Sequence, residues 1–173
     1  MSLIPDKNAA IELLRLAGCS DSVISHSIVV SDCARELAEK IHQNGYAVDI
    51  ELVQIGAILH DIGRSRTHDT RHGVEGVIMA KEFGLDDKIV DIIRTHIGAG
   101  ITPEDAVSLG LPPDRYIPLT LEEKIVAHAD NLVEDEMTVS ISEKVEILSK
   151  KGREENIIER IILLNNEIEN MID

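Results

Sequence analysis

Apolar residues recur along most of the chain at the three- and four-residue spacing of an amphipathic α-helix, and no useful alternating strand pattern is present. Capping residues and glycines divide this pattern into segments, as with Asp6 and Gly18 at the two ends of the first. The expected helices cover residues 6–18, 20–45, 49–63, 72–84 and 86–98, followed by one that Thr120 caps and that carries residues 124–133.

Residues 99–119 interrupt the helical pattern with several glycines and prolines, and predict a long loop with one helical turn in PEDAVSLG. From about residue 140 the pattern predicts two charged amphipathic helices. We therefore expect an all-α bundle of about seven to eight helices in a single domain, 1–173. Residues 20–135 would form its core, and helices in 140–173 would pack on that core.

The composition narrows the class of protein. The 173 residues are enough for one domain, and because aromatic residues make up only 2 %, the core must be aliphatic. The formal net charge of −15 disfavours nucleic acid polymers and anionic membranes as partners, although a bound metal could still attract a small phosphate ester. Two cysteines, no evident signal peptide and no long apolar run favour a reducing cytoplasm.

A histidine and a carboxylate stand together at the end of the third predicted helix, as His60 and Asp61. Neighbouring side chains on a regular helix point about 100° apart. Both can face one metal only where the helix ends, and Gly63 predicts that end. Imidazole and carboxylate ligands suit iron, manganese, nickel, cobalt or zinc, but two ligands are too few for a tight site.

Further candidate ligands lie within or beside apolar helix faces. His26 and Asp130 interrupt apolar stretches, and a buried carboxylate such as Asp130 requires a cation or hydrogen-bond donors. His72 precedes one apolar helix and His96 ends the next. His68 competes with His72 for the same position, and we favour His72 because it directly opens its helix.

The order His26, His60, Asp61, Asp130 resembles the H…HD…D signature of the HD superfamily of metal-dependent phosphohydrolases. Residues 60–63 read HDIG, the form that names one branch of it. The segment from His72 to residue 100, followed by LTLEEKIVAHADNL, looks most like the bacterial HD-type diadenosine tetraphosphate hydrolases. The sequence departs from those enzymes in the loop before Thr120 and in its C-terminal part.

This resemblance implies a mechanism and a ligand set. One divalent metal would be held by His26, His60, Asp61 and Asp130, and Asp61 would bridge to a second metal completed by His72 and His96. Metal-activated water would attack the phosphorus of a nucleotide or other small phosphate ester. Asp61, His60 and Arg64 are the expected catalytic residues, with Arg94 or Lys124 as further phosphate contacts. The loop 99–119 is the expected lid or specificity element.

Two other functions fit the same residues. Some HD proteins with a di-iron centre use oxygen to cleave C–C or C–P bonds, and a non-catalytic nucleotide-sensing module would also retain the ligands. Iron content together with oxygen consumption would distinguish the oxygenase. The apolar stripe of the C-terminal helices is compatible with core packing or with a homodimer face.

Overall fold

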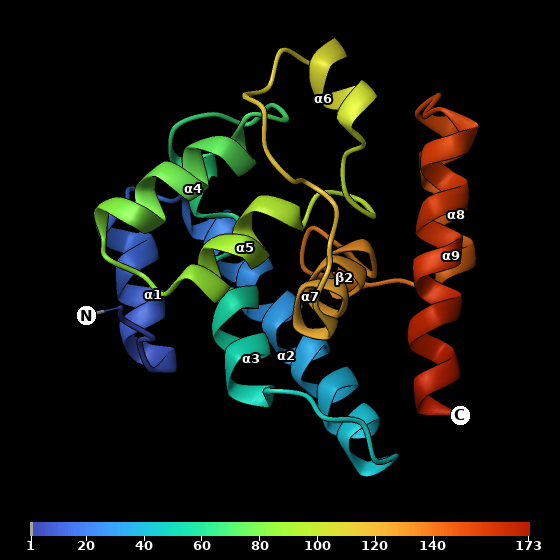
Figure 1. Cartoon of the computed structure of the whole chain (residues 1–173), viewed down its shortest axis with the longest axis horizontal. Helices are drawn as coiled ribbons and strands as arrows, with labels where there is room; N and C mark the ends of the chain where they lie inside the picture. Colours follow the sequence, from blue (N-terminus) through green and yellow to red (C-terminus); the bar gives the residue numbers. More distant parts are fainter. Residues whose placement is uncertain (1) are drawn as a thin grey trace.

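The computed structural model describes residues 2–173, and those residues are mostly helical (Figure 1). The α-helices are α1 (Lys7–Leu16), α2 (Asp21–Gln43), α3 (Ile50–Leu59), α4 (His72–Glu82), α5 (Asp87–Thr95), α6 (Pro103–Ser108), α7 (Leu121–Asn131), α8 (Ile141–Lys150) and α9 (Glu155–Ile172). A short 3-10 helix, η1 (Ile62–Ser65), follows α3, and strands β1 (Val133–Glu134) and β2 (Met137–Thr138) form an antiparallel hairpin after α7. The prediction of an all-α bundle is confirmed.

The described residues contain one helix more than expected. Helix α6 lies within residues 99–119, at the PEDAVSLG stretch where the sequence predicted one helical turn, and is six residues long. The Thr102 side chain accepts a hydrogen bond from the Asp105 backbone N–H, and Pro103 occupies the first turn, where its missing N–H costs nothing. The sequence pattern also gave no sign of the β1–β2 hairpin, because strands of two residues have no measurable period.

Helices α2 and α3 lie side by side near the centre of the bundle, with α1 and α4 on one side and α8 and α9 on the other (Figure 1). The largest fully buried side chains are all leucine or isoleucine, as the composition predicted. Leu164 and Ile168 of α9 belong to the same buried cluster as α2 and α3. Across the described residues, none of the helices is both long and apolar enough to cross a membrane.

Gly63 permits a close approach between η1 and the start of α4. A Cβ atom at this position would lie 1.8 Å from the His72 carbonyl oxygen and 2.5 Å from the Gly76 nitrogen. Both neighbours are backbone atoms and cannot move aside as a flexible side chain can. The absence of a side chain at Gly63 therefore lets the end of α3 and the start of α4 meet.

Candidate metal centre

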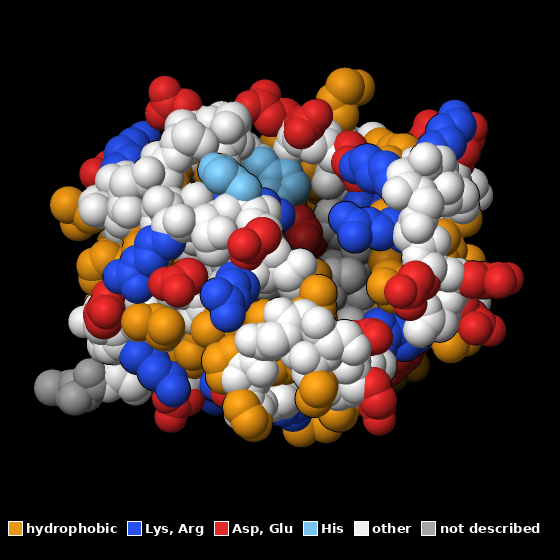
Figure 2. Space-filling view, turned by 90° about the horizontal axis from the view of Figure 1, so that it is seen from above, with side chains coloured by type: hydrophobic (Ala, Val, Ile, Leu, Met, Phe, Trp, Pro, Cys, Tyr) orange, Lys and Arg blue, Asp and Glu red, His pale blue; other side chains and the backbone are white. Residues whose placement is uncertain are grey.

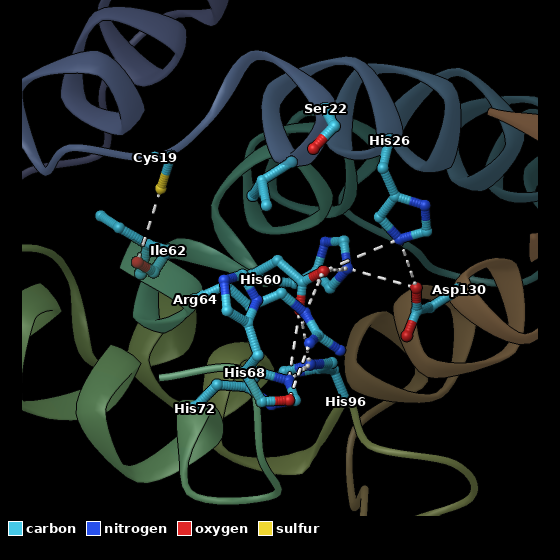
Figure 3. Close-up of polar contacts among 12 residues, drawn as sticks. Cys19, Ser22, His26, His60, Ile62, Arg64, His68, His72, His96 and Asp130 are labelled. Atoms are coloured by element: carbon cyan, nitrogen blue, oxygen red, sulfur yellow. Dashed lines mark hydrogen bonds and ion pairs between the residues drawn. The ribbon is translucent and has the colours of Figure 1, made fainter. Parts of the chain in front are cut away.

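Six residues from five parts of the fold converge on one buried region, and Figure 3 labels all of them except Asp61. They come from α2, the end of α3, the start of α4, the end of α5 and the last turn of α7. They are the six residues that the sequence analysis proposed as ligands: His26, His60, Asp61, His72, His96 and Asp130.

One half of the cluster gathers around Asp130. Its Oδ1 atom lies 2.9 Å from His26 Nε2 and 3.3 Å from His60 Nε2. The Oδ2 atom of Asp61 lies 3.4 Å from His60 Nε2 and 3.7 Å from His26 Nε2. Ligand atoms of His26, His60 and Asp130 all lie within 4.8 Å of one another, a spacing that one metal ion could bridge.

The other half gathers around the second oxygen of Asp61. Its Oδ1 atom lies 3.2 Å from His72 Nε2 and 3.3 Å from His96 Nε2, and these two nitrogens are 3.0 Å apart. Asp61 thus presents one carboxylate oxygen to each half of the cluster.

The local backbone explains how two successive residues face the same cluster. Helix α3 ends at Leu59, and η1 begins at Ile62. Between them Asp61 has φ −98° and ψ 14°, which are not α-helical values. Because the helix ends here, the side chains of His60 and Asp61 can point toward the same cluster, which they could not do within a continuous helix.

The ring orientation of all four cluster histidines is fixed through Nδ1. Each Nδ1 atom lies 2.6–2.7 Å from a backbone carbonyl oxygen, whose owners are Asp135 for His26, Ala57 for His60, Asp69 for His72 and Ile93 for His96. A carbonyl oxygen only accepts hydrogen bonds, so each Nδ1 carries the proton and donates it. In the neutral rings every Nε2 then presents a lone pair to the cluster, the arrangement found in metal-binding histidines.

Two buried polar atoms in the cluster, His60 Nε2 and Asp61 Oδ1, have no hydrogen-bond partner among the described residues. The Nε2 atoms of His72 and His96 approach as two acceptors when both rings are neutral. A cation between these atoms would satisfy them all, and nitrogen and carboxylate donors suit a divalent transition metal. The residues present therefore fit such an ion.

The electrostatics favour ionised carboxylates in the cluster, and their charge outweighs burial to raise the pKa of the His60 imidazole and, less strongly, that of His26. Burial opposes ionisation of Asp61, but the imidazoles of His60, His72 and His96 outweigh it and hold the pKa of that carboxyl well below its ordinary value. Burial alone would raise the pKa of Asp130, but its contacts with His60 and His26 outweigh burial and lower it. Both carboxylates are ionised at neutral pH, and a positive charge beside them, on the imidazoles or on a bound cation, balances them.

The neighbouring residues divide into those that reach the cluster and those that do not. Arg64 Nε lies 3.0 Å from Asp61 Oδ2. His68 is exposed, and its carbonyl accepts a hydrogen bond from Arg64, so its ring is outside the cluster that contains His72. Arg94 pairs with Asp91 of its own helix and with Asp114, and Lys124 pairs with Glu167 of α9, so both charges are engaged with carboxylates outside the cluster.

A cleft of about 910 Å³ opens onto His26 and Asp130. On the face drawn in Figure 2, histidine side chains lie beside a hollow with acidic atoms in its depth and basic side chains on its edge. The cleft is lined by Ser22, Val23, His26, Arg64, His68, Asp130, residues 133–139, Glu143 and Lys144. The β1–β2 hairpin forms the wall that we expected from the 99–119 loop, none of whose residues line this cleft.

The hairpin residues are functional candidates that the sequence analysis missed. Glu134 pairs with Lys144 of α8, and the Asp135 carbonyl accepts the hydrogen bond from His26. Their closeness to Asp130 along the chain was the single available signal.

The amino-acid sequence is similar to those of several known proteins. The family described as HD domain matches residues 23–135. An uncharacterized protein of Methanocaldococcus jannaschii, MJ0778, is 52% identical over 155 residues, which cover 89% of this chain and 92% of that protein. A tRNA (cytidine(56)-2'-O)-methyltransferase of Thermoplasma volcanium is 42% identical over 99% of this chain, but the match covers only 49% of the methyltransferase.

Solved structures share the fold. The HD domain of the L. monocytogenes phosphodiesterase PgpH superposes with a TM-score of 0.55 at 18% identity, covering 94% of this chain and 96% of that one. The same domain in complex with cyclic-di-AMP gives a TM-score of 0.55 at 20% identity, covering 94% and 95% of the two chains.

Proposed function

Because this chain belongs to the HD domain family, we propose that it is a metal-dependent phosphohydrolase that cleaves a phosphate ester of a nucleotide or a similar small molecule. The observation that carries the proposal is the meeting of six ligand-type side chains, with the Nε2 atoms of His72 and His96 3.0 Å apart and no hydrogen bond to Asp61 Oδ1. Such an arrangement is costly without a cation.

The two halves of the cluster suggest two positions for an ion. His26, His60, Asp61 and Asp130 would hold the first, and Asp61, His72 and His96 the second. Bound divalent metals supply a water of lowered pKa and stabilise charge on a phosphoryl group. Arg64 lies beside Asp61 and lines the cleft, so its guanidinium is placed to orient a substrate phosphate.

The cleft supports a nucleotide as the class of substrate. Its volume of about 910 Å³ is in the range of sites for small organic ligands. Asp135 and Glu136 are exposed on its wall, and their negative charges would repel the additional phosphates of a long polymer. The PgpH HD domain, which has the same fold, was solved with cyclic-di-AMP.

The narrower resemblance to diadenosine tetraphosphate hydrolases has no support from the relatives compared above. We therefore propose nucleotide phosphoesters as a class and do not single out a polyphosphate-bridged dinucleotide.

A second candidate substrate is a phosphate ester of RNA. It is favoured by the similarity of 99% of this chain to part of a protein named for its action on tRNA. The net charge of −15 and the acidic wall of the cleft oppose it.

The test is hydrolysis by protein stripped of metal and reloaded with Mn²⁺, Fe²⁺ or Zn²⁺. The substrates are cyclic-di-AMP, a linear dinucleotide and tRNA, with the Asp61→Asn variant as control. Hydrolysis of a dinucleotide that needs metal and is lost in the variant supports the proposal. Cleavage of tRNA alone favours the second candidate. No hydrolysis of any phosphate ester with any of the three metals, by protein that retains them, contradicts both.

A further inference from the structure

The four cluster histidines all donate an Nδ1 hydrogen bond to a backbone carbonyl, but the carbonyl is local in sequence for three of them and distant for His26. His60, His72 and His96 each donate to the carbonyl three residues earlier in the chain, at Ala57, Asp69 and Ile93. These contacts form wherever the local helix end or turn forms. The His26 partner is the Asp135 carbonyl, 109 residues away.

That remote carbonyl belongs to the turn between β1 and β2. Asp135 is the first of the two turn residues, since Glu134 pairs with Met137. Its φ of 52° is the only positive φ at a non-glycine residue in the part of the chain that the structure describes. Aspartate tolerates this left-handed region better than most residues, whereas proline, with φ fixed near −65°, cannot adopt it. The direction of the Asp135 carbonyl therefore depends on an unusual backbone conformation.

The hairpin is anchored on both sides of the turn. Val133 is 3 % exposed and packs in the main core, and the Val139 N–H donates to the Leu132 carbonyl at 2.8 Å. Glu134 pairs with Lys144 of α8, both largely shielded from water. The turn is thus held at a defined place above α2, where His26 lies.

We propose that the β1–β2 turn is a positioning element that orients His26, so that the conformation at Asp135 sets the metal affinity of the His26, His60 and Asp130 half of the cluster. This rests on the metal-dependent function proposed above. A partner that holds the second ring nitrogen of a ligand histidine fixes its tautomer and its direction, and losing it typically lowers metal affinity roughly 10–100-fold. For His26 that partner is the turn.

Three substitutions at one position separate the backbone from the side chain. Asp135→Pro forbids the positive φ, and Asp135→Gly preserves it while removing the carboxylate. If circular dichroism shows that Asp135→Pro does not fold, Asp135→Val replaces it, because a β-branched residue is strained at this φ but retains its N–H. Mn²⁺ binding to metal-stripped protein is measured by calorimetry for each variant, and again in a His26→Ala background.

We expect Asp135→Pro to weaken Mn²⁺ binding at one site by roughly 10–100-fold, Asp135→Gly to bind as wild type, and Asp135→Pro to cause no further loss once His26 is alanine. A folded Asp135→Pro or Asp135→Val protein with wild-type affinity would overturn the proposal. Equal weakening by Asp135→Gly would also overturn it, because the carboxylate and not the turn would then matter.

Nitrogen-15 NMR of the histidine rings gives a second readout that does not need activity. At a pH high enough for the rings to be neutral, wild-type His26 should show the Nδ1–H form. In Asp135→Pro, His26 alone should lose it, while His60, His72 and His96 retain it. If wild type binds no metal, the proposed function fails, and the same spectra of the metal-free protein still decide whether the turn orients His26.

Discussion

The Nε2 atoms of His72 and His96 lie 3.0 Å apart, although the Nδ1 atom of each ring already donates to a backbone carbonyl. Two neutral rings in this arrangement direct lone pairs at each other beside the Asp61 carboxylate. Burial lowers the pKa of His96, which disfavours a proton as the bridge. A metal ion is the simplest group that satisfies both nitrogens and the carboxylate together.

Removing either ring should remove an ion. We expect His72→Ala and His96→Ala each to lower the metal content of purified protein by about one ion per chain, because only Asp61 would remain with one imidazole. Elemental analysis of anaerobically purified protein measures this. The matched control is His68→Ala, an exposed histidine four residues before His72. A loss in His68→Ala equal to that in His72→Ala would show that the ligand has been assigned wrongly.

Gly63→Ala should destabilise the protein and weaken its metal site. The added Cβ would meet the His72 carbonyl oxygen at 1.8 Å, so η1 and α4 must separate. Overpacking of this kind costs about 1–3 kcal/mol, and the displacement moves a ligand residue. Urea denaturation and metal content test the two effects. Gly45→Ala, at a positive φ but in open space, should lose stability without losing metal, and wild-type stability in Gly63→Ala would refute the steric argument.

Arg64→Gln should impair hydrolysis while leaving metal content unchanged. The guanidinium lies beside Asp61 and lines the cleft, but it has no lone pair with which to bind a cation. Losing one charge-assisted contact to phosphate should lower kcat/KM roughly 10–100-fold. The control is Arg66→Gln, whose side chain pairs with Glu75 and Glu82 away from the cleft. Equal activity in the two variants would remove Arg64 from the catalytic residues.

Glu123 should make stability depend on pH. Burial alone would raise its pKa, but hydrogen bonds from Arg115, the Leu119 N–H and the Thr95 hydroxyl outweigh burial and lower it. A folded-state pKa below the unfolded value contributes stability that is complete above the unfolded pKa and is lost as pH falls through the folded pKa. The free energy of unfolding should therefore decrease on acidification below the ordinary glutamate range.

The substitution that isolates this contribution is Glu123→Gln. At neutral pH we expect it to cost about 1.5–3 kcal/mol, the range for hydrogen bonds to a charged group, and the deficit should shrink as the pH falls. Urea denaturation at several pH values measures it, with Glu51→Gln, at an exposed position, as the control. A deficit that stays constant with pH would mean that the charge of Glu123 contributes nothing.

Structural features that depend on residues close together in the sequence could be predicted from the sequence alone. Asp6 and Thr120 cap the helices that they were expected to cap, because a capping side chain bonds only to residues two or three positions later. The all-α class followed from the same local periodicity. The six ligand-type residues were proposed from their order and a family resemblance, and the structure brings them into one cluster.

Contacts between segments far apart in the sequence could not be predicted in this way. The contact between His26 and the Asp135 carbonyl spans 109 residues and involves a backbone atom, which leaves no trace in residue type. The 99–119 segment was expected to cover the active cleft, but Ile101, Leu111 and Tyr116 bury themselves in a small cluster of their own. Loop composition predicted irregular structure correctly but could not predict where it packs.

The division of Asp61 between the two halves of the cluster has a consequence for how ions are acquired. If both positions take an ion, one carboxylate would serve both, so the ion that arrives second would meet a carboxylate already partly neutralised by the first. Loading should then be stepwise, with two unequal dissociation constants. The proportion of singly and doubly loaded molecules would follow the free metal concentration around the protein, and activity that needs both ions would follow the larger of the two dissociation constants.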